Sequence, residues 1–104
     1  MLITPSHRIM LMYDIHPDHH EAYYQYMLGE FVPELQKMGL YMIYAWQVYG
    51  ENQPERFVEF VCESVGILKT VLTSLEFQDA EERLKEYTVN YRRKVVIFKN
   101  RPQV

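Results

Sequence analysis

A proline inside a long amphipathic pattern constrains the fold of this chain more than any other feature of its sequence. Through residues 19–38, apolar side chains recur at steps of three and four, which places them on one face of a helix. Pro33 lacks the amide hydrogen that would bond the carbonyl of Gly29, so we predict a bend or a loosened turn between them. This bend either follows a curved sheet or opens room beneath the helix for a ligand. Gly39 is predicted to end the helix in the left-handed conformation.

Strand patterns lie on both sides of this helix. Residues 8–15 alternate between an apolar face and a mixed face, which predicts a strand with one face toward the core. Residues 40–49 and 56–63 are typical of two further strands, and the turn-forming residues 50–54 between them predict a hairpin. Residues 91–99 are predicted to form the last strand.

Capping signals mark where the helices begin. An Asp-x-x-Glu pattern at residues 18–21 predicts a capping box for the long helix. Ser64 is predicted to cap a short helix over residues 65–72. A Thr-x-x-Glu pattern at residues 73–76 predicts a capping box for a helix over about residues 77–89.

The order of elements predicts the fold class. It is β-α-β-β-α-β, which predicts a single α+β domain over residues 1–104 with the ferredoxin-like split fold. Such a fold has a four-stranded antiparallel sheet with helices on one face only. Because soluble monomers rarely expose a large apolar patch, we expect the other face to be covered by a ligand or by a second chain. Two chains that bring these faces together would enclose a barrel with a ligand cavity.

This open face is where we expect side chains that contact a ligand. If Ile9 and Leu11 pack on the helices, the alternate residues of the first strand point outward. The same reasoning applied to the other strands completes the set. The residues predicted to line the cavity are Arg8, Met10, Met12, Asp14, Gln47, Phe57, Glu59 and Arg93.

In the second strand the prediction depends on register. Tyr44 and Trp46 belong to its more apolar face and are predicted to pack on the helices, which would turn Gln47 toward the cavity. A shift of one residue exchanges the two faces, so both assignments stay open.

In the last strand a basic run at residues 92–94 has two interpretations. It either holds an anionic ligand or prevents wrong pairing at an edge strand. If Val96 packs on the helices, Arg93 faces the cavity. Arg93 would then lie near Glu59 or Arg8.

Composition excludes several classes of function. A net charge of −3 disfavours general binding to nucleic acid. No apolar run approaches the about 20 residues that span a bilayer. Cys62 is the only cysteine, which is typical of a reducing compartment, and residues 1–8 are too short and polar for a signal peptide. We therefore expect a cytoplasmic protein. His16 precedes Pro17 and is biased away from helical geometry, so His16 and His20 are not expected to form a metal-binding pair at helical spacing. No metal ion or other cofactor is predicted.

The chain from about residue 8 to residue 99 resembles the dimeric α+β barrel superfamily. This superfamily includes antibiotic-biosynthesis-monooxygenase-like, EthD-like and NIPSNAP-like domains. The matching features are Glu30-Phe31-Val32-Pro33 leading to Gly39, the segment from Trp46 to Gly50, and Ser74-Leu75-Glu76-Phe77 leading into the last helix. Relatives include cofactor-independent oxygenases, haem-degrading enzymes, isomerases and proteins without known activity. Haem degradation is not supported, because the first helix has histidines only at its N-terminal end.

Two hypotheses of function follow from the fold and the resemblance. In the first, the protein is a homodimer with a pocket between the sheet and the first helix for a partly apolar organic molecule. If this homodimer is an enzyme, the resemblance implies a cofactor-independent oxygenase or isomerase. In the second, the protein is a non-enzymatic binding or assembly module, and the interior of the barrel is dimer core. Fold alone does not decide between them.

Overall fold

The computed structural model describes residues 7–97 and confirms the predicted order of elements. The strands are β1 (His7–Ile15), β2 (Tyr41–Gln47), β3 (Arg56–Cys62) and β4 (Thr88–Ile97). They form an antiparallel sheet in the order β2-β3-β1-β4, which is the ferredoxin-like arrangement. The predicted last strand extends to residue 99, and residues 98–99 lie outside the described part of the chain.

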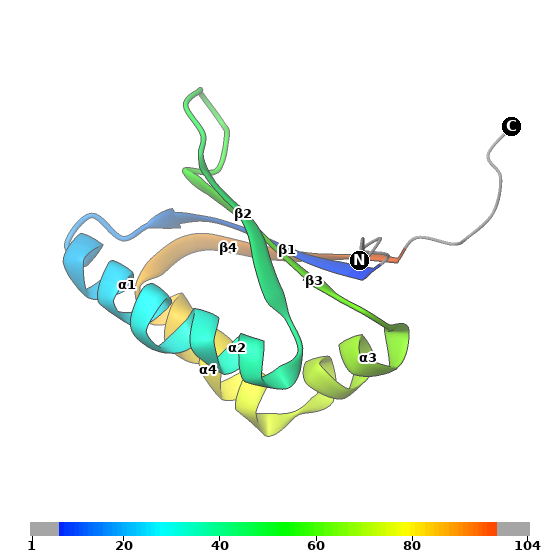
Figure 1. Ribbon diagram of the computed structural model, residues 1–104. Coiled ribbons are helices and arrows are strands. Elements are labelled where there is room, and N and C mark those ends of the chain that lie inside the picture. The colour runs from blue at the N-terminus through cyan, green and yellow to red at the C-terminus, as the bar shows by residue number, and fades with distance from the viewer. Residues whose placement is uncertain (1–6, 98–104) are drawn as a thin grey trace, which may run out of the picture.

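The helices all lie on one side of this sheet (Figure 1). They are α1 (His20–Tyr26), α2 (Val32–Met38), α3 (Val65–Thr73) and α4 (Leu75–Glu86), with a π-helical turn η1 (Met27–Phe31) between α1 and α2. No helix within residues 7–97 is long and apolar enough to cross a membrane. The loop between β2 and β3 rises on the side of the sheet away from the helices (Figure 1).

The predicted loosening of the first helix is confirmed as this π-helical turn. The amide of Val32 donates to the carbonyl of Met27, five residues back, in place of the usual four. Pro33 explains the wider turn, because it has no amide hydrogen to donate to Gly29. Phe31 at the end of the turn is fully buried. The bend therefore turns an aromatic side chain into the core.

Side chains from the sheet and the helices fill the interior. Tyr13 and Phe60 come from the sheet and are fully buried, and Phe31 meets Phe60 edge-on at 5.9 Å between ring centroids. Cys62 is also buried, as predicted. The predicted helix-facing residues of β1 and β3 are all in this core. They are Ile9, Leu11, Tyr13, Ile15, Val58, Phe60 and Cys62.

The structure confirms two of the predicted helix ends and corrects three. Gly39 ends α2 with a φ of 100°, and the Ser64 hydroxyl accepts a hydrogen bond from the amide of Ile67. The capping box at residues 18–21 is wrong, because His19 is the N-cap residue of α1.

The start of α4 is the second correction. Ser74, and not Thr73, caps α4 by accepting from the amide of Phe77. The Thr73 hydroxyl donates instead to the carbonyl of Lys69 within α3. The helix also ends earlier than predicted, at Glu86.

A bulge in β2 corrects the predicted faces of that strand. The pairing with β3 shifts between Met42 and Tyr44, so the alternation of side chains reverses within the strand. Beyond the shift, Tyr44 is paired with Glu59 and Trp46 with Phe57. Paired residues share a face, so Tyr44 and Trp46 lie on the open face and not on the helices.

Candidate functional site on the open face of the sheet

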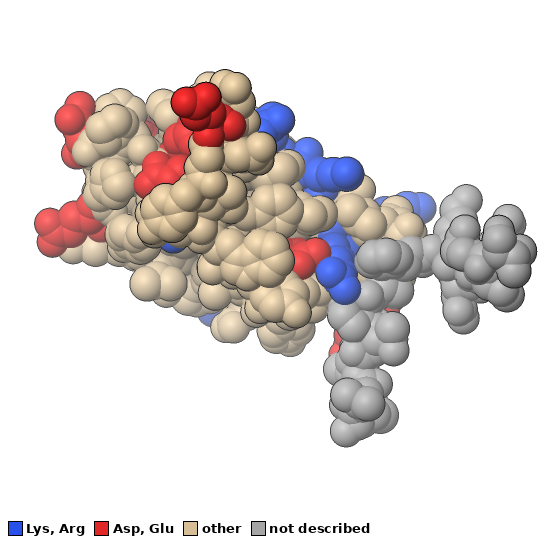
Figure 2. Space-filling model, turned by 90° about the horizontal axis from the view of Figure 1, so that it is seen from above, with Lys and Arg blue, Asp and Glu red and all other residues tan. Residues whose placement is uncertain are grey.

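The open face of the sheet is mainly uncharged, with charged residues set into it (Figure 2). Its largest exposed side chains are Tyr41, Tyr44 and Trp46 of β2, which are 51%, 48% and 53% exposed. The pairing register assigns the remaining members from β3, β1 and β4. They are Phe57, Glu59, Val61, Arg8, Met10, Met12, Asp14, Arg92, Lys94 and Val96.

Six of the eight predicted site residues share this face. They are Arg8, Met10, Met12, Asp14, Phe57 and Glu59. At the centre of the face, Arg8 and Glu59 form an ion pair with 2.9 Å between Nη1 and Oε1. The carboxylate of Glu59 is buried within the sheet surface, whereas the Arg8 side chain stays partly exposed. The sequence prediction that polar groups sit inside an apolar face is therefore confirmed for this pair.

Arg93 does not lie on the open face, and the prediction for it is wrong. It pairs with Leu11, whose side chain faces the helices. Its guanidinium lies 3.2 Å from the buried carboxylate of Glu81 on α4, which also accepts a hydrogen bond from the Tyr91 hydroxyl. Arg93 was predicted to lie near Glu59 or Arg8. Its ion pair with Glu81 instead connects β4 to α4.

Gln47 is the second predicted site residue that lies elsewhere. It is paired with Arg56, which in turn is paired with the buried Tyr13. Because paired residues share a face, Gln47 and Arg56 belong to the helix side of the sheet. The bulge in β2 explains the error, since it exchanges the faces of all residues after Met42.

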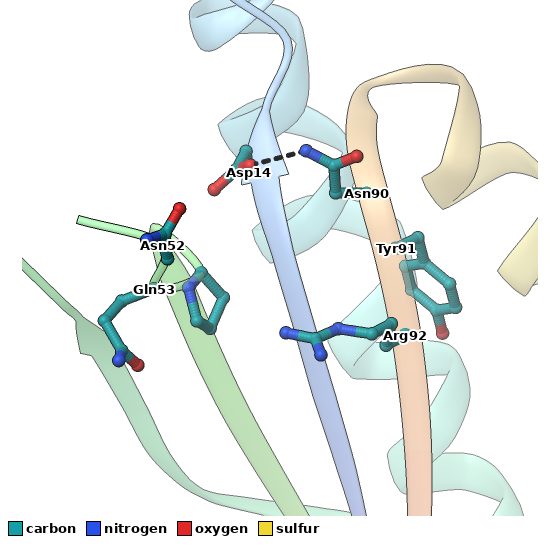
Figure 3. Close-up of a pocket in the computed structure, with 7 residues that line it drawn as sticks. Asp14, Asn52, Gln53, Asn90, Tyr91 and Arg92 are labelled. Atoms are coloured by element: carbon teal, nitrogen blue, oxygen red, sulfur yellow. Dashed lines mark hydrogen bonds between the residues drawn. The ribbon is translucent and has the colours of Figure 1, made fainter. Parts of the chain in front are cut away.

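A cavity of about 510 Å³ opens at one end of the open face (Figure 3). Its lining comes from the end of β1, from the loop between β2 and β3, and from the start of β4. The lining residues are Asp14, Asn52, Gln53, Pro54, Asn90, Tyr91 and Arg92. The volume lies within the range of about 300–1,000 Å³ that is usual for small-molecule sites.

Asp14 holds the walls of this cavity together. One of its carboxylate oxygens accepts from the amide of Glu55 at 2.8 Å, and the other accepts from the side-chain amide of Asn90 at 3.0 Å. The first bond fixes the loop between β2 and β3, and the second fixes the start of β4. Asn52 and Asn90 both adopt positive φ, of 62° and 56°. Asparagine tolerates this conformation better than most residues.

Asp14 has two hydrogen-bond partners, whereas no partner within the described residues neutralises the charge of Arg92. Its side chain is exposed and extends across β1 toward the loop between β2 and β3 (Figure 3). Within residues 7–97, it makes no hydrogen bond or ion pair. Within the basic run at residues 92–94, Arg92 lines the cavity, and not Arg93 as predicted.

The sequence did not predict that the loop between β2 and β3 and the start of β4 line a common cavity. The turn-forming residues 50–54 and the isolated Asn90 gave a signal for backbone turns but none for a shared cavity. Within residues 7–97, no group of three or more His, Cys, Asp or Glu side chains is arranged to hold a metal ion. The cavity lining offers a guanidinium, a carboxylate, several side-chain amides and the Tyr91 hydroxyl, which already donates to Glu81.

Tyrosines fill the space between the sheet and the first helix, where a pocket was predicted. The hydroxyls of Tyr13 and Tyr23 are hydrogen-bonded to each other, and that of Tyr26 donates to the carbonyl of Ala80. Burial raises the pKa of Tyr13 well above its usual value, with the neighbouring Tyr23 adding to the effect. Burial also raises the pKa of Tyr26 to about 12, although the Arg83 guanidinium partly offsets it.

We expect these tyrosines to make the protein unstable to alkali. Their folded-state pKa values lie above the unfolded value of about 10, so the unfolded chain ionises first as the pH rises. The stability due to the neutral hydroxyls is full below about pH 10 and is lost as the pH rises toward the folded-state values. Urea unfolding between about pH 8 and pH 11 should show this decline. Tyr26→Phe should decline less steeply, and a decline identical to that of the wild type would contradict the assignment of Tyr26.

Several solved structures share the fold of this chain. An EthD-family protein from Bacillus halodurans matches with a TM-score of 0.64 at 12% identity, over 86% of this chain and 94% of its own. A dimeric ferredoxin-like protein from an uncultured marine organism matches with a TM-score of 0.62 at 14% identity, over 97% and 94%. A Nitrosomonas europaea protein, described provisionally as an antibiotic biosynthesis monooxygenase, matches with a TM-score of 0.58 at 13% identity, over 96% and 95%.

These likenesses establish the fold. The chain has the fold of the dimeric α+β barrel proteins, and the structural resemblance predicted from the sequence is confirmed. A scan against protein-family models finds no match. A comparison with curated proteins finds none either.

Proposed function

We propose that the protein is a homodimer that brings the open faces of two sheets together and binds a small organic molecule in the cavity at the end of each face. The observation that carries the proposal is the exposed aromatic surface of β2. Trp46 stacks on Phe57 with 6.0 Å between ring centroids and still exposes half of its surface. Exposed aromatic side chains of this kind are typical of protein interfaces.

A second copy of the chain is the partner that suits this surface. The acidic Asp14 lies at one end of the face, and the basic Arg92 and Lys94 lie along β4. A twofold interface brings the same patch of two chains together, so opposite charges at different positions can meet. The likeness to a protein described as a dimeric ferredoxin-like protein supports the same partner.

The proposed role of the cavity is to bind a ligand, in preference to catalysing a reaction. Both carboxylate oxygens of Asp14 already accept hydrogen bonds that hold the cavity walls. Its role is thereby structural, which leaves the cavity without an uncommitted general base among its lining side chains. For an enzymatic role, the likeness to a protein described as an antibiotic biosynthesis monooxygenase favours oxygenation, which is one of the two cofactor-independent classes that the family resemblance implied. The compartment proposed is the cytoplasm, and neither nucleic acid nor a membrane is a proposed partner.

Light scattering after size-exclusion chromatography tests the dimer. The wild-type protein should have twice the mass of one chain at micromolar concentration. Trp46→Asp should give the mass of one chain, because it places a charge in the exposed aromatic surface of β2. Leu75→Asp is the matched control, since Leu75 is 72% exposed at the start of α4 in the helix layer. Leu75→Asp should stay dimeric.

A wild-type protein with the mass of one chain would overturn the proposal. Equal dissociation of both variants would also count against it, because the effect would then come from the added charge and not from the open face. Circular dichroism of both variants should show unchanged secondary structure, which separates dissociation from unfolding.

A further inference from the structure

A row of four side chains crosses the open face from the cavity to the far edge of the sheet. Arg92 of β4 is paired with Met12 of β1, and Met12 is paired with Phe57 of β3. Phe57 is paired in turn with Trp46 of β2, and the two rings are stacked. Neighbouring strands are about 4.8 Å apart, so the row spans about 14 Å. It has one cationic end, and the rest of it is apolar and aromatic.

The cationic end of this row is the free guanidinium of the cavity. Figure 3 shows the Arg92 side chain directed into the space between β4 and the loop that contains Asn52 and Gln53. Asp14 is the only carboxylate among the lining residues, and it accepts hydrogen bonds from Glu55 and Asn90 instead of pairing with Arg92. A guanidinium has a fork of N–H donors whose geometry matches a carboxylate.

We infer that this row binds an aromatic carboxylate, with its carboxylate group on Arg92 and its ring over Met12 and Phe57. The inference deepens the proposed function, because the partner sheet would cover the ring from the other side. Methionine and aromatic side chains make favourable contacts with a ring. The side-chain amides of Asn52 and Gln53 can hydrogen-bond to the oxygens that the guanidinium leaves free.

The charges favour a singly charged carboxylate over a phosphate. The lining carries one positive charge, that of Arg92, and one negative charge, that of Asp14. A phosphate monoester carries nearly two negative charges near neutral pH and would lie beside this carboxylate with a single cation to balance it. Lys94 is on the same face, two residues further along β4, but it is not part of the lining.

Heteronuclear NMR titration of the full chain with phenylacetate tests the inference. Phenylacetate should shift the amide signals of residues around the cavity and the indole signal of Trp46, which is the only tryptophan. Phenylacetamide has the same shape without the charge and should bind about 10- to 100-fold more weakly, the usual value of a charge-assisted hydrogen bond. Arg92→Gln should weaken phenylacetate binding by a similar factor. Lys69→Gln removes the same charge from α3 in the helix layer, away from the open face, and should leave the affinity within about twofold.

The outcomes separate this inference from the proposed dimer, because the mass of every variant is measured in parallel by light scattering. A dimer that binds phenylacetate and phenylacetamide equally, or that loses binding equally in both variants, would overturn the inference and leave the dimer standing. Inorganic phosphate binding more tightly than phenylacetate would overturn the choice of a carboxylate. A monomer that still binds phenylacetate through Arg92 would support the carboxylate site while overturning the proposed dimer.

Discussion

Phe31→Ala should lower the free energy of unfolding by about 3–5 kcal/mol, the usual cost of removing a buried aromatic side chain. Phe31 is fully buried at the end of the π-helical turn and packs against the rings of Phe60 and Tyr26. The substitution leaves a cavity where the helix layer meets the centre of the sheet, and the wide turn above it is fixed by Pro33. The surrounding backbone therefore has little freedom to close the gap.

Leu28→Ala is the matched control for this experiment. Leu28 lies in the same π-helical turn but is 63% exposed, so its truncation should change stability by no more than about 0.5 kcal/mol. Urea unfolding of both variants at one protein concentration provides the measurement, since dimerisation would make stability depend on concentration. A loss below about 1 kcal/mol for Phe31→Ala would contradict the packing of the turn against the sheet.

The parts of this fold that follow from local chemistry were predictable from the sequence. Steps of three and four identify the buried face of the first helix, and the missing amide of Pro33 leads directly to the widened turn. Gly39, which has no side chain, ends α2 in the left-handed conformation, and the Ser64 hydroxyl caps α3. Thr73 shows the limit of such local rules, because the adjacent Ser74 competes for the same cap.

The faces of β2 and β4 were not predictable, because they depend on pairing between distant strands. One extra residue between Met42 and Tyr44 exchanges the two sides of β2. In β4, Arg92 pairs with Met12 and Arg93 with Leu11, so Arg92 faces the open side and Arg93 faces Glu81. The shift in β2 has no signature in residue type. The cavity was missed for the same reason, since Asn52 and Asn90 meet only after the sheet has formed.

Arg8→Met should destabilise the protein by about 2–3 kcal/mol, because it leaves the carboxylate of Glu59 buried without its ion-pair partner. Breaking a fully buried pair usually costs about 3–5 kcal/mol. The expected loss is smaller here because the Arg8 side chain is 28% exposed and that of Glu59 is 9% exposed, so water screens part of the interaction. Glu59→Leu should cost only about 1 kcal/mol, because the long Arg8 side chain can turn its charge toward water.

The double variant Arg8→Met with Glu59→Leu distinguishes an ion pair that stabilises the sheet from one that only avoids a buried charge. If the pair mainly compensates its own desolvation, the double variant should recover to within about 1 kcal/mol of the wild type. It should also dimerise more tightly, since a polar pair at the centre of the open face becomes apolar surface. Urea unfolding and light scattering over a dilution series measure the two effects. A double variant as unstable as the sum of the single ones would show that the two side chains act independently, and the central pair would then have no part in holding the face together.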